Sequence, residues 1–149
     1  MININGYKLI HKVLTKQYFA VLATEKDQKP YTNLVAFVLI DNLENIIFAT
    51  NRNTQKYSNI SANPNVALLF DSRTNRSSDL SNAIAISAIG LATETSEQEK
   101  LTLLPYLIKK HPNLNTFIKS KETAIIKVGI NEYTIARFKS VERINIKTP

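Results

Sequence analysis

Polar side chains gathered between residues 50 and 56 are of the types that bind a phosphate group. Thr50 and Thr54 carry hydroxyls, and Arg52 and Lys56 carry positive charges. The unpaired amides in the first turn of a helix have partial positive charge, so a helix beginning just after Thr54 would add donors to this set. The pattern indicates a site for a phosphate monoester. Ordinary solvated loop residues would fit the composition of the segment equally well, and the order of the surrounding elements is what separates the two interpretations.

Two strands and a short helix are predicted to hold these side chains. The apolar run of Ile46, Ile47 and Phe48, which ends at Ala49 and Thr50, favours a β-strand. Thr54 is a good N-cap for the helix that follows, and Asn63-Pro64 ends that helix because the residue before a proline is disfavoured in the helical conformation. Residues 66–70 then predict a second strand.

This order of elements resembles the flavin mononucleotide (FMN)-binding split barrels typified by pyridoxamine 5'-phosphate oxidase. Over about residues 18–94 the matching features are, in order, Ala23-Thr24, the turn at Lys29-Pro30, the strand 31–40, Thr50, Lys56, Asn59, Asn63-Pro64 and the strand 66–70. The resemblance implies a mainly β fold, a six-to-seven-stranded antiparallel split β-barrel with peripheral helices, that spans residues 1–149 as a single domain. It also implies a homodimer whose two flavin sites lie at the subunit interface.

The resemblance further implies which residues contact FMN. In this family the isoalloxazine ring lies along the second and third strands and contacts mainly their backbone. By position, the ring contacts fall on Asn33, Leu34, Val35, Ala49 and Thr50. The phosphate contacts fall on Thr50, Arg52, Gln55 and Lys56.

Two of these positions depart from the family pattern. Family members often have a cation where this chain has Gln55, and an arginine where it has Asn33. A glutamine donates a hydrogen bond but carries no charge, so either the phosphate affinity is lower or Arg52 takes over the missing cation.

The implied function is that of an FMN-dependent oxidoreductase or flavin reductase, with an unknown substrate, unknown catalytic residues and a nicotinamide electron donor. Authentic pyridoxamine phosphate oxidation is not expected, because the C-terminal Arg-x-His segment of that oxidase is replaced here by Arg137-Phe138-Lys139. Two alternatives remain open. One is a non-catalytic module that binds a flavin, a deazaflavin or haem, and the other is a cofactor-free split barrel that acts as an interaction protein.

The amino-acid composition excludes several kinds of protein and of active site. A chain of 149 residues with 44% hydrophobic content is long enough for one domain with a real core. The absence of cysteine excludes a disulfide framework, a thiol nucleophile and an iron–sulfur cluster, and two histidines, His11 and His111, are too few for a usual zinc site, so no metal is expected. The sequence shows neither an apolar run that could span a bilayer nor an apolar signal core, so we expect a cytoplasmic protein without a membrane partner.

The net charge of +7 raises nucleic acid as a partner. The lysines, however, are spread along the chain, and the sequence contains no tryptophan and no cluster of aromatic residues that could stack on bases. We therefore expect small anionic molecules rather than nucleic acid.

The rest of the chain alternates helices and strands. The remaining predicted elements are a helix over 5–17, a strand over 18–24, an exposed loop over 71–81, a strand over 82–95 with a bulge at Gly90, a helix that opens at the Ser96 and Glu99 capping box and is kinked by Pro105, a short helical piece from Pro112 to Ile118, one long bent strand or a pair of strands over 122–138, and an edge strand over 141–146.

Overall fold

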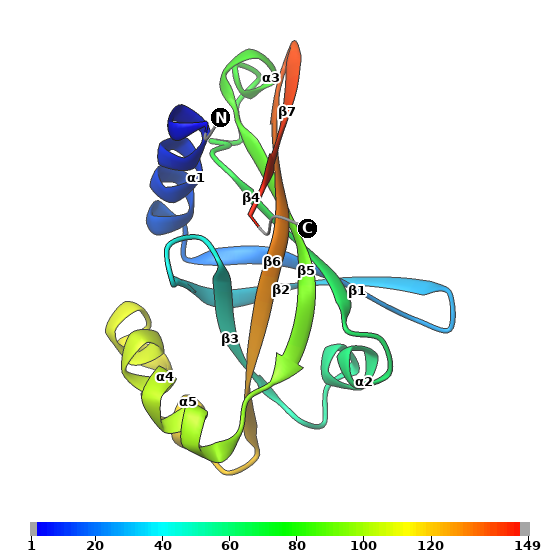
Figure 1. The fold of residues 1–149 in the computed structure, drawn as a ribbon, viewed down its shortest axis with the longest axis vertical. Coiled ribbons are helices and arrows are strands. Elements are labelled where there is room, and N and C mark those ends of the chain that lie inside the picture. The colour runs from blue at the N-terminus through cyan, green and yellow to red at the C-terminus, as the bar shows by residue number, and fades with distance from the viewer. Residues whose placement is uncertain (1–2, 147–149) are drawn as a thin grey trace.

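Six antiparallel strands close into a barrel in the computed structural model, which describes residues 3–146 (Figure 1). The strands are β1 (Phe19–Lys26), β2 (Lys29–Ile40), β3 (Asn45–Asn51), β4 (Asn65–Asp71), β5 (Ala85–Glu94) and β6 (Thr123–Arg137), and β7 (Ser140–Asn145) adds an extra strand beside β6. Their order is β3-β2-β1-β4-β5-β6-β7, and pairing of β3 with β6 closes the barrel. The predicted mainly β split barrel is confirmed.

The helices lie around the barrel. They are α1 (Ile4–Lys16), α2 (Gln55–Ala62), α3 (Asp79–Asn82), α4 (Glu97–Lys110) and α5 (Asn115–Lys119), with a 3₁₀ turn, η1, at Pro112–Leu114. The predicted caps are present: Thr54 accepts from the amide of Tyr57, and Ser96 accepts from the amide of Glu99. α4 continues through Pro105 to Lys110. None of the helices within residues 3–146 combines the length and apolar character needed to cross a bilayer.

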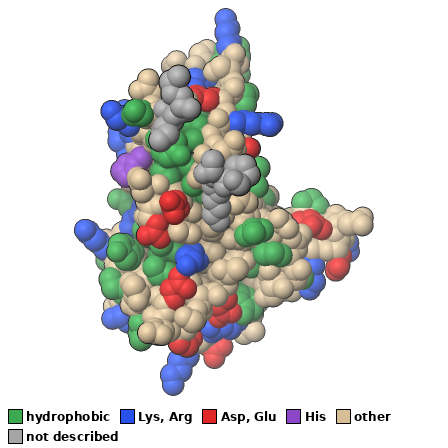
Figure 2. Space-filling view, viewed as in Figure 1, with side chains coloured by type: hydrophobic (Ala, Val, Ile, Leu, Met, Phe, Trp, Pro, Cys, Tyr) green, Lys and Arg blue, Asp and Glu red, His purple; other side chains and the backbone are tan. Residues whose placement is uncertain are grey.

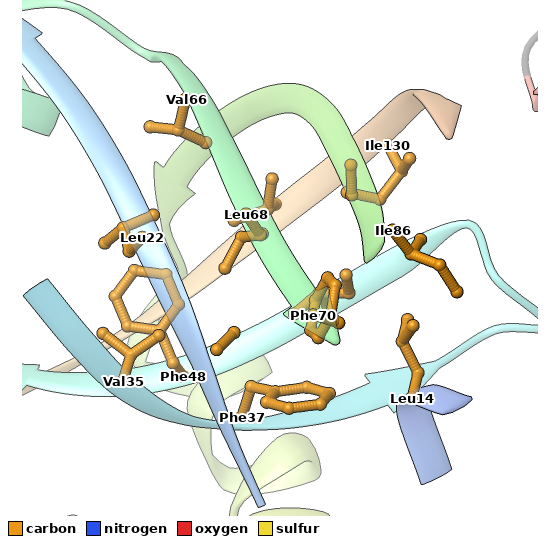
Figure 3. Close-up of a cluster of buried hydrophobic side chains, with 14 of the residues drawn as sticks. Leu14, Leu22, Val35, Phe37, Phe48, Val66, Leu68, Phe70, Ile86 and Ile130 are labelled. Atoms are coloured by element: carbon orange, nitrogen blue, oxygen red, sulfur yellow. The ribbon is translucent and has the colours of Figure 1, made fainter. Parts of the chain in front are cut away.

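The barrel interior is filled by large apolar side chains from every barrel strand (Figure 3). Phe37 and Phe70 meet edge to face, with ring centroids 4.7 Å apart. α1 covers part of this core with Ile10 and Leu14, which are fully buried. Burial of such a side chain stabilises the fold by roughly 1.5–3 kcal/mol, so this core holds the barrel and with it the geometry of the site.

A second apolar cluster lies outside the barrel, where α4 and α5 cover parts of β2, β3 and β6. Its buried members are Val38, Ile40, Ile47, Leu103, Leu107, Ile118 and Ile125. The continuous apolar character of residues 31–40 predicts that both faces of this strand are covered. This holds only from Phe37 onward, because Leu34 on the uncovered first half of β2 is 65% exposed.

Two other predictions need correction. The segment predicted as loop over 71–81 and strand from 82 contains α3, and β5 begins only at Ala85. The cause is Asp79, whose carboxylate accepts the backbone amides of Thr74, Asn75 and Arg76 and so folds the loop back onto the helix. These hydrogen bonds lower the pKa of Asp79, the backbone bond from Thr74 being the main cause.

The C-terminal region resolves the alternative that the sequence leaves open. Residues 123–137 form one long strand, β6, rather than a pair. Ile89 pairs with Glu132 and Gly90 with Ile130, so Asn131 is left as an extra residue in β6. The bulge predicted at Gly90 thus lies opposite that residue, in β6 rather than in β5 itself.

Candidate functional site

The strands β2 and β3 are paired over only part of their lengths. Phe37–Ile40 of β2 pair with β3, whereas the preceding residues, 29–36, pair with β1 alone. On β3, Ala49, Thr50 and Asn51 pair with β6 on their other side. Backbone N–H and C=O groups along the two parting edges thus lack a strand partner and are free to contact a ligand. We refer to this region as the split.

The predicted ring-binding residues flank the split. Asn33, Leu34 and Val35 lie on β2 just before its pairing with β3 begins, and Ala49 and Thr50 lie on β3 just after that pairing ends. The structure thus brings these five residues to the two sides of one opening, although they come from separate segments.

The side chain of Asn33 is not satisfied within the chain. Asn33 pairs with Leu22, which is fully buried, so its side chain lies on the barrel side of the sheet. Its Oδ1 is buried without a hydrogen-bond partner among residues 3–146, and its Nδ2 makes only a long bond, 3.4 Å, to the carbonyl of Leu34. A buried amide oxygen without a donor is costly, and a donor on a ligand would remove that cost.

The turn between β3 and α2 is held by its own hydroxyls. Thr54 Oγ1 donates to the carbonyl of Asn51 at 2.8 Å and lies 3.0 Å from Oγ1 of Thr50, which is buried. The amides of Gln55 and Lys56, in the first turn of α2, have no partner in the described part of the chain. These two N–H groups are the predicted anion-binding donors.

Arg52 is engaged with the protein itself. Its guanidinium donates to Glu94 Oε1 from Nε at 3.0 Å and from Nη2 at 2.5 Å, and from Nη1 to the carbonyl of Lys121 at 2.7 Å. The hydroxyl of Tyr57 donates to the other oxygen of Glu94 at 2.5 Å. Burial alone would raise the pKa of Glu94, but the hydrogen bonds from Tyr57 and Arg52 hold it below its usual value. Glu94 thus neutralises Arg52.

Lys56, in contrast, is a cation without an acidic partner. No carboxylate within residues 3–146 lies at ion-pair distance from its Nζ. Its side chain is half-buried, and this burial lowers the pKa of Lys56. An anion at the start of α2 would reverse that effect, because it favours the charged form.

Gln55 takes part in a chain of amides. Its Nε2 donates to Oδ1 of Asn59 at 2.7 Å, and Nδ2 of Asn59 donates to Oγ1 of Thr24 at 2.9 Å. Asn59 and Thr24 are both buried. This chain fixes the first turn of α2 against β1.

A hollow of about 450 Å³ opens beside the start of α2, and the sequence reasoning did not foresee it. It is lined by Lys26, Asp27, Lys29, Pro30, Tyr31, Gln55 and Asn59. The signal that could have found it is the two-residue turn Asp27-Gln28, which makes Lys26 and Lys29 cross-strand partners on the same face of the hairpin.

Neither histidine lies at the split or at the start of α2. His111 is buried, and its Nε2 lies 2.8 Å from the carbonyl oxygen of Phe37, so this nitrogen is the donor. His11 is exposed on α1. Among residues 3–146, no three acidic or histidine side chains are grouped in a way that could hold a metal ion.

The comparison with protein families agrees with this geometry. The sequence model described as pyridoxamine 5'-phosphate oxidase matches residues 8–134. The chain belongs to the pyridoxamine 5'-phosphate oxidase family. The matched residues include the split, the turn and α2. No curated protein matches the chain in sequence.

Solved structures of this family and of related proteins share the fold. A haem-binding protein from Mycobacterium smegmatis superimposes with a TM-score of 0.85 at 10% identity, over 97% of this chain and 60% of that one. A general stress protein 26-related protein of the pyridoxinephosphate oxidase family from Clostridium acetobutylicum gives 0.77 at 12% identity, over 97% of both chains. An FAD-binding protein from Mesorhizobium loti gives 0.67 at 17% identity, over 83% of this chain and 88% of that one. At these identities the likeness concerns the fold alone.

Proposed function

We propose that the chain binds FMN and acts as an FMN-dependent oxidoreductase or flavin reductase of unknown substrate. The observation that carries the proposal is the split between β2 and β3, whose free backbone edges lead directly to the unpaired amides of α2 and to Lys56. Membership of the pyridoxamine 5'-phosphate oxidase family supports it. A flavin carries hydride or electron transfer when it is bound.

The residues present fit the flavin ring. The edges of β2 and β3 offer backbone donors and acceptors to the polar edge of the ring. The orphaned Oδ1 of Asn33 would receive a donor, which is the kind of partner it lacks within the chain. Leu34 and Val35 would contact the ring mainly through their backbone atoms. Family members can therefore differ in the side chains at these positions and keep this part of the site.

The residues at the start of α2 also fit the phosphate of FMN, although they carry less positive charge than the family pattern has at these positions. The amides of Gln55 and Lys56 and the ammonium group of Lys56 are positioned for a phosphate monoester at the start of α2. Thr50 and Thr54 orient the turn that presents these groups. The role of Arg52 at the phosphate stays a prediction, and its ion pair with Glu94 favours a positioning role over direct contact.

We propose a homodimer because the outer face of the β2-β1-β4-β5 part of the sheet is apolar and is left exposed by residues 3–146. Its exposed members are Phe19, Leu34, Leu69, Ile89 and Leu91. Val21 pairs with both Leu34 and Leu69, and Ala67 pairs with Ile89, so these side chains form one continuous surface. A second copy would cover this surface, and Leu34 links it to the split.

Haem is the second candidate, raised by the likeness to the haem-binding protein of Mycobacterium smegmatis. The buried histidine His111 does not support haem binding, because its Nε2 already donates a hydrogen bond to the carbonyl of Phe37.

We also propose a cytoplasmic protein that does not bind nucleic acid. On the face shown in Figure 2, acidic side chains are interspersed with lysine and arginine rather than excluded by a continuous basic surface.

The experiment that tests the function is an absorbance spectrum of the purified protein, followed by titration with FMN. We expect flavin bands in the spectrum or flavin binding on titration, and oxidation of a reduced nicotinamide by the loaded protein. A Soret band with no flavin binding would favour haem. A colourless protein that binds neither would leave the cofactor-free interaction protein. Flavin binding without nicotinamide oxidation would point to a flavin-binding module.

A further inference from the structure

We propose that Lys26 and Lys29, at the end of the β1–β2 hairpin, supply the phosphate of FMN with the positive charge that Gln55 lacks. The inference rests on the proposed function. It assigns the hollow beside α2 to the phosphate end of the cofactor.

The need for further charge follows from the state of the other cations. A phosphate monoester carries about −1.5 to −2 charges near neutral pH. Arg52 is neutralised by Glu94, and Gln55 carries no charge. Lys56 is then the single unpaired cation among the predicted phosphate residues, and it leaves the dianion partly uncompensated.

The hairpin places two lysines where this charge is missing. Lys26 and Lys29 are cross-strand partners, as are Thr24 and Tyr31, so all four share one face of the hairpin. That face is turned toward α2, because Thr24 accepts from Asn59 and Lys26 donates to Ser58 Oγ at 2.9 Å. Both lysines line the same hollow as Gln55, the first residue of α2.

Neither lysine is neutralised by an acidic residue among residues 3–146. In the described part of the chain, no carboxylate lies at ion-pair distance from Lys26 or Lys29. The oxygens of the neighbouring Glu25 accept from the amide of Gln28 and from Nδ2 of Asn63. Of the described residues that line the hollow, Asp27 is the one acid. Lys26 spends one of its three N–H groups on Ser58 and keeps two for an anion.

The test compares FMN with riboflavin, which has the same ring but no phosphate, in the chain of 149 residues. The variant Lys26→Gln/Lys29→Gln removes the two proposed cations. The variant Lys12→Gln/Lys109→Gln removes two exposed lysines from α1 and α4 and has the same net charge. Dissociation constants for both flavins are measured by fluorescence titration at several salt concentrations.

We expect the Lys26→Gln/Lys29→Gln variant to bind FMN about tenfold or more weakly, with a shallower salt dependence, while its riboflavin affinity changes by less than about twofold. The control variant should match the wild type. Equal losses for FMN and riboflavin would mean a structural role for the lysines and would overturn the inference, as would an unchanged FMN affinity. If the wild type binds neither flavin, the proposed function itself fails and the inference goes with it.

Discussion

Arg52 and Glu94 form an ion pair across 42 positions of sequence, with Nη2 of the arginine 2.5 Å from Oε1 of the glutamate. The pair ties the turn before α2 to the end of β5, and the bond from Arg52 to the carbonyl of Lys121 ties the same turn to the segment before β6. The predicted phosphate turn is thus held by the end of β5 on one side and by the segment before β6 on the other. Arg52, which the sequence suggests as a phosphate ligand, instead uses its guanidinium group for these contacts with Glu94 and Lys121.

Arg52 could either hold the turn in place or contact the phosphate directly, and substitutions of Arg52 and Glu94 distinguish these two roles. Arg52→Gln should change the dissociation constant for FMN by less than about twofold if Glu94 neutralises the arginine. Glu94→Gln should instead strengthen FMN binding by roughly two- to fivefold, because the charge of Arg52 is then unopposed. Both variants should lose no more than about 1 kcal/mol of unfolding free energy, since the pair is partly exposed. An Arg52→Gln variant that loses FMN affinity but keeps riboflavin affinity would show direct contact with the phosphate.

Lys56 is predicted to meet the phosphate directly. Replacing it by alanine should weaken FMN binding by roughly 1–3 kcal/mol, the range for a charge-assisted hydrogen bond. Lys109→Ala, an exposed lysine at the end of α4, serves as the control. Isothermal titration of both variants with FMN measures the difference, and an unchanged dissociation constant for Lys56→Ala would exclude the role.

The pH dependence of FMN binding gives an independent check on Lys56. Burial lowers the pKa of this lysine, so it loses its proton at a lower pH than an ordinary lysine. The protonated form attracts the phosphate, and FMN affinity should therefore fall as pH rises through that lowered pKa. The Lys56→Ala variant should lack this alkaline decline. A decline of equal size in both proteins would assign it to another group.

The sequence was informative about the parts of the site that depend on local chemistry. Thr54 as an N-cap and Asn63-Pro64 as the end of α2 follow from preferences that act within a few residues, and the structure has both. The order of the strands and the helix along the chain follows from the family resemblance, and the structure confirms it.

The features that the sequence could not predict depend on partners far apart in the chain. The pairing of Glu94 with Arg52, and the position of the two hairpin lysines beside the same hollow as Gln55, both require the closed barrel. The exposed outer face at Leu34 was also missed, because an apolar run looks the same whether its second face is covered by this chain or by another.

Gly90 is predicted to be essential for the strand pairing at the bulge. A Cβ atom there would lie 2.2 Å from the carbonyl oxygen of Gly129, so Gly90→Ala must displace the backbone of β6. We expect a loss of about 2–4 kcal/mol in unfolding free energy. Gly6→Ala is the matched control, since its Cβ would meet the terminal methyl group of the Ile144 side chain, at 2.3 Å, rather than a backbone atom, and alanine favours the helix. Urea unfolding should show a loss below about 1 kcal/mol there, and equal losses would contradict the argument.

The homodimer is predicted to depend on the apolar outer face. Leu69→Lys/Ile89→Lys places two charges in the centre of that face, and sedimentation velocity should then show a monomer. Val141→Lys, on the exposed edge strand β7, should leave the dimer intact. Loss of the dimer should also weaken flavin binding, because the proposed sites lie at the interface. A wild-type monomer, or a double variant that still dimerises, would refute this arrangement.

Lys110 is predicted to make stability depend on pH. Its Nζ lies 3.9 Å from the centroid of the Phe37 ring and 3.5 Å from the carbonyl of Leu14, and burial lowers the pKa of Lys110 to about 8. In the unfolded chain a lysine titrates at about 10.4, so between these values the unfolded state binds more protons and the folded state gains stability as pH rises. Below about pH 8 the ammonium group is charged in both states, and its burial opposes folding.

Lys110→Met keeps the length of the side chain and removes the charge. The variant should therefore be more stable than the wild type by about 1 kcal/mol near neutral pH, a figure reduced for the partial exposure of the group. This advantage should shrink toward pH 10 as the wild-type lysine becomes neutral. Urea unfolding at both pH values measures it, with Lys109→Met on the exposed side of α4 as the control. A Lys110→Met variant that is less stable at neutral pH would mean that the contact of the ammonium group with Phe37 outweighs the cost of its burial.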